Sequence, residues 1–96
     1  MQGTHEDRSL AAIGRRLLAT RTAIGLNQRQ FAQRAKIAPN TYNQWERGSS
    51  RPRLDEAIRL VDEYDITLDW IYLGDQRRLA YELIDALRQS GSIRRP

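Results

Sequence analysis

Residues 39–47 read PNTYNQWER, and this stretch is the most informative part of the chain. Four of its polar residues recur at the i, i+3, i+4 and i+7 spacing of one α-helical face: Asn40, Asn43, Gln44 and Arg47. Tyr42 and Trp45 fall on the opposite face. Pro39 suits the first position of a helix, where its missing N–H would have no partner. The stretch therefore predicts a helix that buries two aromatic side chains and exposes an amide-rich face.

That exposed face has the chemistry of a surface that contacts base edges. Side-chain amides pair bidentately with adenine, and arginine pairs in the same way with guanine. An ordinary solvated helix face more often carries Glu/Lys pairs, and asparagine is a poor helix former. We interpret the helix as a DNA recognition helix, with a merely amide-rich solvated face as the structural alternative.

Short helical patterns, separated by Gly, Pro or Asn, lie on both sides of this helix. We expect the other helices at residues 9–22, 28–36, 54–64, 68–73 and 76–89. Asn27 and Gln30 form a capping box before the second helix, and Thr67 caps the fifth. The sequence contains no strand pattern, so the predicted fold class is all-α.

The composition argues against several classes of function. The 96 residues include no cysteine, which excludes disulfides and thiolate metal sites, and His5 is the single histidine. No apolar run reaches the ~18 residues of a membrane span, and no signal peptide or phosphate-binding glycine loop is present. We expect a cytoplasmic protein without enzyme activity, metal or cofactor.

Positive charge is concentrated in the first half of the chain. Residues 1–53 hold ten Lys/Arg and three Asp/Glu, a net charge of +7, whereas residues 54–96 hold six and nine, a net charge of −3. Lys36 is the one lysine among the 16 cationic residues, and the rest are arginines, whose fork matches phosphate and guanine. The asymmetry predicts a polyanionic partner, and an arginine-rich codon preference is the alternative explanation.

Several short motifs keep the order and spacing of one known family. They are Arg21, Gly25-Leu26-Asn27-Gln28, Phe31-Ala32, Trp45-Glu46-Arg47-Gly48, Arg51-Pro52-Arg53 and Ile66-Thr67-Leu68-Asp69-Trp70. From Ile13 to about Gly74 the chain resembles the five-helix Cro/CI-type (XRE-like) helix-turn-helix domain of phage repressors and bacterial regulators. This resemblance implies a five-helix lambda-repressor-like fold, and the helix expected at residues 76–89 is an addition beyond the family core. The expected division is a flexible N-terminus (1–8), the helix-turn-helix domain (9–74), the C-terminal helix (75–90) and a basic tail (91–96).

The resemblance also implies roles for individual residues. Positions that contact bases in the major groove are matched by Asn40, Thr41 and Gln44, with Asn43 beside them. The expected contacts with the DNA backbone or the groove flank are Gln28, Pro39, Arg47, Arg51 and Arg53. Arg53 matches an arginine that approaches the minor groove. Arg21 and Glu46 match a largely buried salt bridge between the first and third helices.

The chain departs from the family pattern at the start of the third helix. Ala38 stands where Ser or Thr normally caps this helix, and alanine is a poor cap. Pro39 follows, where many relatives place a longer polar residue that contacts a base. We therefore expect the outermost base contact to be apolar or missing. The loop before Arg53 is also about one residue shorter than in the lambdoid repressors.

These observations predict a sequence-specific regulator of transcription that binds double-stranded DNA, most simply a repressor, and acts as a homodimer. The candidate dimer contacts are Trp70, Ile71, Leu79, Leu83 and Leu87, for which packing within the monomer is equally open. One alternative is the antitoxin of a toxin–antitoxin pair, with a protein toxin as its main partner. A protein-bridging adaptor is another, and an RNA-binding module is disfavoured because an A-form major groove excludes a helix.

Overall fold

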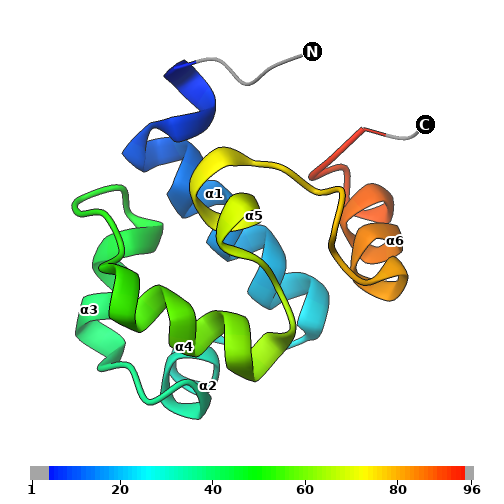
Figure 1. Cartoon of the computed structure of the whole chain (residues 1–96). Helices are drawn as coiled ribbons and strands as arrows, with labels where there is room; N and C mark the ends of the chain where they lie inside the picture. Colours follow the sequence, from blue (N-terminus) through cyan, green and yellow to red (C-terminus); the bar gives the residue numbers. More distant parts are fainter. Residues whose placement is uncertain (1–4, 95–96) are drawn as a thin grey trace.

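The computed structural model describes residues 5–94, and the regular structure within them is entirely helical (Figure 1). A 3-10 turn, η1 (His5–Arg8), precedes the α-helices α1 (Leu10–Ile24), α2 (Gln28–Arg34), α3 (Pro39–Glu46), α4 (Leu54–Tyr64), α5 (Leu68–Leu73) and α6 (Tyr81–Gln89). The predicted all-α class is confirmed. The bounds predicted for the fourth and fifth helices are correct, whereas α1 ends two residues later than predicted and α2 two residues earlier.

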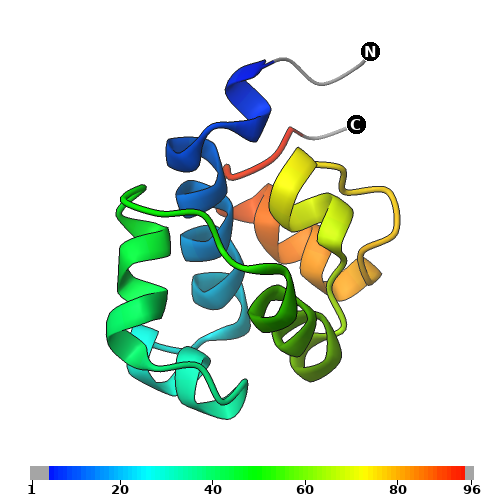
Figure 2. The same ribbon diagram turned by 60° about the vertical axis from the view of Figure 1, so that its left-hand side comes forward.

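Helix α1 is the central element of the fold. Helices α3, α5 and α6 and the η1 turn all pack against it. Helices α2 and α3 lie on one side of α1 and α6 lies on the other (Figures 1 and 2). This arrangement leaves the outer face of α3 uncovered by the other helices.

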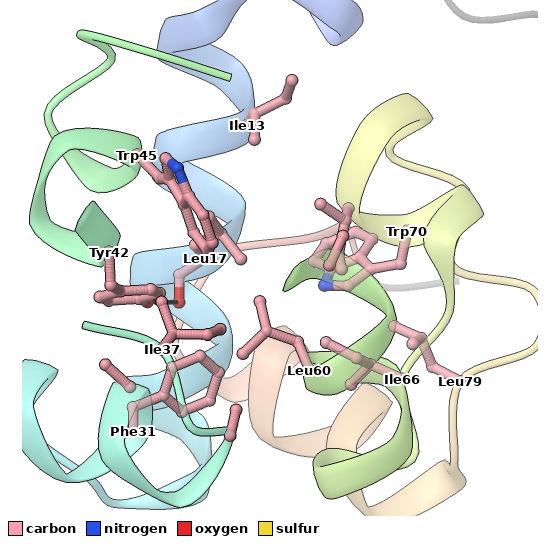
Figure 3. Packing of buried hydrophobic residues seen from close by; sticks show 14 of the residues in the cluster. Ile13, Leu17, Phe31, Ile37, Tyr42, Trp45, Leu60, Ile66, Trp70 and Leu79 are labelled. Carbon is pink, nitrogen blue, oxygen red and sulfur yellow. Dashed lines mark hydrogen bonds between the residues drawn. The ribbon is translucent and has the colours of Figure 1, made fainter. Parts of the chain in front are cut away.

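One apolar cluster joins the two sides of the molecule (Figure 3). Ile13 and Leu17 of α1 lie within it and are almost fully buried. Its largest other members are Phe31, Tyr42, Trp45, Leu60, Trp70, Ile71 and Leu87. The ring of Tyr64 stacks on that of Phe31 with centroids 4.2 Å apart. Burial of each such side chain stabilises the fold by about 1.5–3 kcal/mol, so the cluster holds α3 against α1 and α2 against α3.

Polar groups fix α5 and η1 on α1. The buried Thr20 hydroxyl donates to the Arg16 carbonyl (2.6 Å) and accepts from Trp70 Nε1 (2.9 Å). Arg16 donates through Nε and Nη2 to the Ile71 carbonyl (3.2 and 2.9 Å) and through Nη2 to the Asp7 carbonyl (2.6 Å). Burial lowers the pKa of Arg16 from its ordinary value. The sequence analysis did not identify this role of Arg16, because its partners are backbone carbonyls distant in the sequence.

The helix ends follow the predicted chemistry. The capping box at α2 is present, since Asn27 Oδ1 accepts from the Gln30 amide (2.8 Å) and Gln30 Oε1 accepts from the Asn27 amide (3.0 Å). The Thr67 hydroxyl accepts from the Trp70 amide (2.9 Å), as expected for an N-cap. Gly25 ends α1 at φ +94°, a left-handed conformation that glycine adopts without strain.

The predicted start of the last helix, at residue 76, is wrong. Helix α6 begins at Tyr81, and the preceding residues form a turn. Asp75 Oδ1 accepts from the backbone amide of Arg77 (3.0 Å), and its carboxylate also pairs with the Arg77 guanidinium (2.7 Å). An aspartate that binds the amide two residues ahead favours a turn over a helix. Leu79 nevertheless reaches the core from this turn.

The residues expected at a dimer contact lie in the core of the monomer. Trp70, Ile71, Leu79 and Leu87 are buried, and Leu83 is half-buried against them. Packing within the monomer, one of the two alternatives that the sequence leaves open, accounts for these side chains. A dimer contact through them stays a prediction.

Both ends of the described chain contain local structure. Residues 5–8, which the sequence analysis placed in the N-terminal segment, form the η1 turn, while residues 1–4 lie outside the described range. In the predicted tail, Ile93 packs against the core and the Ser92 amide donates to the Leu87 carbonyl (2.9 Å); residues 95–96 lie outside the description. Between residues 5 and 94 no helix has the length and apolar character needed to cross a bilayer.

Candidate nucleic-acid interface

Helix α3 has the two faces that its sequence predicts. The side chains of Tyr42 and Trp45 are 0% and 2% exposed. Asn40 and Gln44 are exposed on the outer face, and Thr41 and Asn43 are half-exposed beside them. Among the described residues, none forms a hydrogen bond with the side chain of Asn40, Asn43 or Gln44. Their donors and acceptors are therefore available to an external partner.

Backbone contact between α1 and α3 sets the position of α3. A Cβ atom added to Gly14 would lie 2.5 Å from the Glu46 carbonyl oxygen and 2.7 Å from that of Trp45. Real Cβ atoms do not approach backbone this closely, so this position requires glycine. The last turn of α3 thus rests directly on α1. The sequence analysis missed Gly14, because a glycine inside a helix does not show which backbone approaches it.

Glu46 anchors α3 through a network of charged and polar groups. Its carboxylate receives Arg21 Nε (2.6 Å) and Nη2 (3.2 Å) in a bidentate pair, with side-chain exposures of 6% for Glu46 and 17% for Arg21. The Tyr42 hydroxyl also donates to it. The hydrogen bond to Glu46 raises the pKa of Arg21, and burial raises the pKa of Tyr42. The salt bridge expected between the first and third helices is thus present.

Gln28 adds a third helix to this network. Its Nε2 donates to Glu46 Oε1 (2.8 Å), which ties the first turn of α2 to the end of α3. The sequence resemblance assigned Gln28 to a contact with the DNA backbone. The structure shows Gln28 bound to Glu46, which uses one of its two amide hydrogens.

Arg59 of α4 stabilises the turn between α2 and α3. Lys36 adopts φ +60°, which is unusual for a residue other than glycine. Its carbonyl accepts a hydrogen bond from Arg59 Nη1 of α4 (3.0 Å). This bond stabilises the angle between the two helices. Sequence reasoning did not identify Arg59, because an arginine on an exposed helix face carries no local signal of such a partner.

A hollow of about 370 Å³ lies between the outer face of α3 and the start of α4. Thr41 and Gln44 line it from α3, and Arg51 and Arg53 line it from the connecting loop. It therefore brings two residues expected to contact bases together with two expected to contact the backbone. Arg53 is exposed, whereas Arg51 Nη1 also donates to the Arg8 carbonyl (3.0 Å).

The two ends of α3 complete the surface. Pro39 occupies its first position, and Ala38 makes no side-chain capping bond, as its sequence predicts. Arg47, directly after the last turn, is exposed. The surface thus presents amides at the centre of α3 and guanidinium groups at its C-terminal end and in the following loop. Residues 5–94 contain no group of three metal-ligating side chains.

Comparison with known proteins agrees with this geometry. A helix-turn-helix family model matches residues 17–71, which span more than half of the chain and include α2, α3 and the Arg53 loop. No curated protein matches the chain, and no solved structure does. The chain therefore belongs to the helix-turn-helix family of the XRE/Cro-CI type, a family of DNA-binding transcriptional regulators.

Proposed function

We propose that this protein is a sequence-specific repressor that inserts α3 into the major groove of double-stranded DNA. The observation that carries the proposal is the contrast between the two faces of α3. Tyr42 and Trp45 fix the helix from behind, while the amides of Asn40 and Gln44 are exposed without a partner among the described residues. When DNA binds, a base edge can replace the water molecules that hydrogen-bond to an exposed amide. The amide then keeps its hydrogen bonds, and its desolvation is compensated.

Base contacts come from the N-terminal part of α3. Asn40 and Gln44 are one turn apart on the same face, so both can reach base edges along one groove. Thr41 and Asn43 flank them and contribute hydroxyl, methyl and amide contacts. Pro39 offers only an apolar contact at the edge of the surface, such as that made with a thymine methyl group.

Phosphate contacts come from residues around α3. Arg47 and Arg53 are exposed cations, and the Arg51 guanidinium keeps donors beyond its bond to Arg8. Together with the free amide hydrogen of Gln28, these groups position the protein without reading sequence. A repressor that acts by blocking a promoter requires only this DNA-binding surface, because a protein bound to the promoter excludes RNA polymerase.

The test is selection of bound duplexes from random DNA by the full chain. A shared motif is expected, present twice with centres about 34–36 Å apart if two copies bind one operator. Asn40→Ala and Gln44→Ala are each expected to relax one base position by about 1–3 kcal/mol. Arg53→Ala serves as the matched control, since it should weaken binding to all sequences and reduce the salt dependence. Absence of any shared motif, or equal effects of all three substitutions across sequences, would contradict the proposal.

A further inference from the structure

A pocket of about 700 Å³ lies along the outer face of α1. Its other walls are the end of η1, the end of α5 and residues 90–93, which follow α6. Two of these walls, η1 and residues 90–93, lie outside the region that the family model matches. Because α3 and α6 lie on opposite sides of α1 (Figures 1 and 2), a partner bound by α3 leaves this pocket open. The volume is within the ~300–1,000 Å³ of small-molecule sites.

Apolar side chains form one part of the pocket lining. Leu18 of α1 is 44% exposed, and Ile93 reaches the lining from the segment after α6. Ala12 and Ala19 of α1 add to this wall. A ligand with an apolar body would remove this surface from water, which favours binding.

The hydroxyl groups of the lining use their hydrogens within the protein. The Thr22 hydroxyl donates to the Leu18 carbonyl (2.7 Å). The Ser90 hydroxyl donates to the Leu87 carbonyl (3.0 Å) and lies 2.8 Å from that of Ser92. A ligand that needs hydrogen-bond donors would therefore find them on the arginines of the pocket.

Arg16 offers such a donor in a fixed position. Its Nε and Nη2 are used by the carbonyls of Ile71 and Asp7, whereas Nη1 makes no hydrogen bond within residues 5–94. Nη1 lies beside Gly74, where an added Cβ would be 3.1 Å away, so glycine leaves this nitrogen uncovered. Burial lowers the pKa of Arg16, and an anion at Nη1 would compensate for the lost hydration of its charge.

We propose that this pocket binds a small organic acid that has an apolar body. The carboxylate is held by Arg15 and Arg16, and the body packs against the apolar wall. The charged residues of the lining are Arg15, Arg16 and Asp7, which together carry a net charge of +1. A singly charged carboxylate matches this charge, whereas a phosphate dianion exceeds it and leaves the apolar wall uncovered. The inference goes beyond the proposed function, and its test requires no DNA.

The test compares octanoate with octanol, which has the same apolar body without the charge. Each is titrated into the full chain while amide chemical shifts are followed by NMR. Saturable shifts are expected at Gly74, Gly91 and Ser92, and at the Nε–H of Arg16, with none on α3. Octanoate should bind roughly 10–100-fold more tightly than octanol, as for a hydrogen bond to a charged group. The Arg16 signal reports on this residue without a substitution that could unfold the protein.

Two variants separate the charged and apolar contacts. Arg15→Glu changes an exposed residue and should weaken octanoate binding but not octanol binding, whereas Arg29→Glu, the same change on α2, should alter neither. Leu18→Ala should weaken the binding of both ligands equally, by about fourfold for each CH₂ group that leaves contact. Ile24→Ala, at a 37% exposed side chain of the same helix, is the matched control.

The outcomes distinguish the pocket from its ligand class. Equal affinities for octanoate and octanol, or octanoate binding unchanged by Arg15→Glu, overturn the organic acid. Shifts confined to α3, or no saturable shift with either ligand, overturn the pocket. Neither result affects the selection of a DNA motif by α3, so the proposed function stands or fails by its own test.

Discussion

Gly14→Ala tests whether direct backbone contact with α1 fixes the position of α3. The added Cβ would lie 2.5 Å from the Glu46 carbonyl oxygen, about 0.9 Å closer than ordinary van der Waals contact. Because the obstacle is backbone, no side chain can rotate away, and the last turn of α3 must move. Overpacking of this kind lowers the free energy of unfolding by about 3 kcal/mol, and the better helix propensity of alanine offsets up to about 1 kcal/mol of this loss. The expected net loss is about 2 kcal/mol of the free energy of unfolding.

Urea unfolding and thermal melting of the full chain measure this loss. For a domain of this size, 2 kcal/mol lowers Tm by about 8–16 °C. Arg15→Gly and Arg15→Ala, at an exposed neighbouring position of α1, report the propensity difference without the contact. The displaced helix should also bind the selected DNA less tightly at temperatures where the variant is folded. A Gly14→Ala protein as stable as the unmodified one would show that α1 and α3 are not in backbone contact.

Three further perturbations address single interactions. Arg21→Met leaves the Glu46 carboxylate buried without its cation, so the free energy of unfolding should fall by about 3–5 kcal/mol. The double variant Arg21→Met with Glu46→Gln should be less destabilised. An unchanged melting curve of Arg21→Met would contradict the anchoring role. Lys36→Gly relieves a left-handed conformation and should raise stability by about 0.5–1 kcal/mol, whereas a loss would show that the strain is absent. Burial raises the pKa of Tyr64 to about 12. The unfolded phenol ionises near pH 10 while the folded one stays protonated, so urea titrations should show stability falling between pH 10 and 12, and falling less steeply in Tyr64→Phe.

Local chemistry explains why much of the fold could be predicted. The aromatic and amide faces of α3 follow from spacing alone, and the Asn27/Gln30 capping box follows from residues three positions apart. The predicted bounds of α4 and α5 are also correct, and those of α5 follow from Thr67 and Gly74, which mark its two ends by their own conformational preferences. In each case the decisive interaction lies within a few residues of the chain.

Two of the missed contacts join partners that are distant in the sequence, whereas the late start of α6 follows from a local turn. The leucine repeat in residues 79–87 suggested one helix, but the aspartate-capped turn at Asp75 delays the start of α6 to Tyr81. The bond from Arg59 to Lys36 joins residues 23 positions apart, and the Arg16 contacts with α5 join residues 55 positions apart. Periodicity also could not distinguish a core residue such as Leu87 from a dimer contact, because both are apolar on one helix face.

The structure separates the residues that hold α3 from those that can contact DNA. Glu46 accepts hydrogen bonds from α1, α2 and α3 itself, so its charge is satisfied within the protein. The amides of Asn40 and Gln44 have no partner in residues 5–94 and are carried on a helix that cannot tilt without breaking those bonds. A rigid helix with unpaired amides discriminates between bases because a wrong base leaves a donor or acceptor unmatched, and the helix cannot shift to recover it. The specificity of α3 should therefore depend on Arg21 and Gly14, neither of which needs to contact DNA.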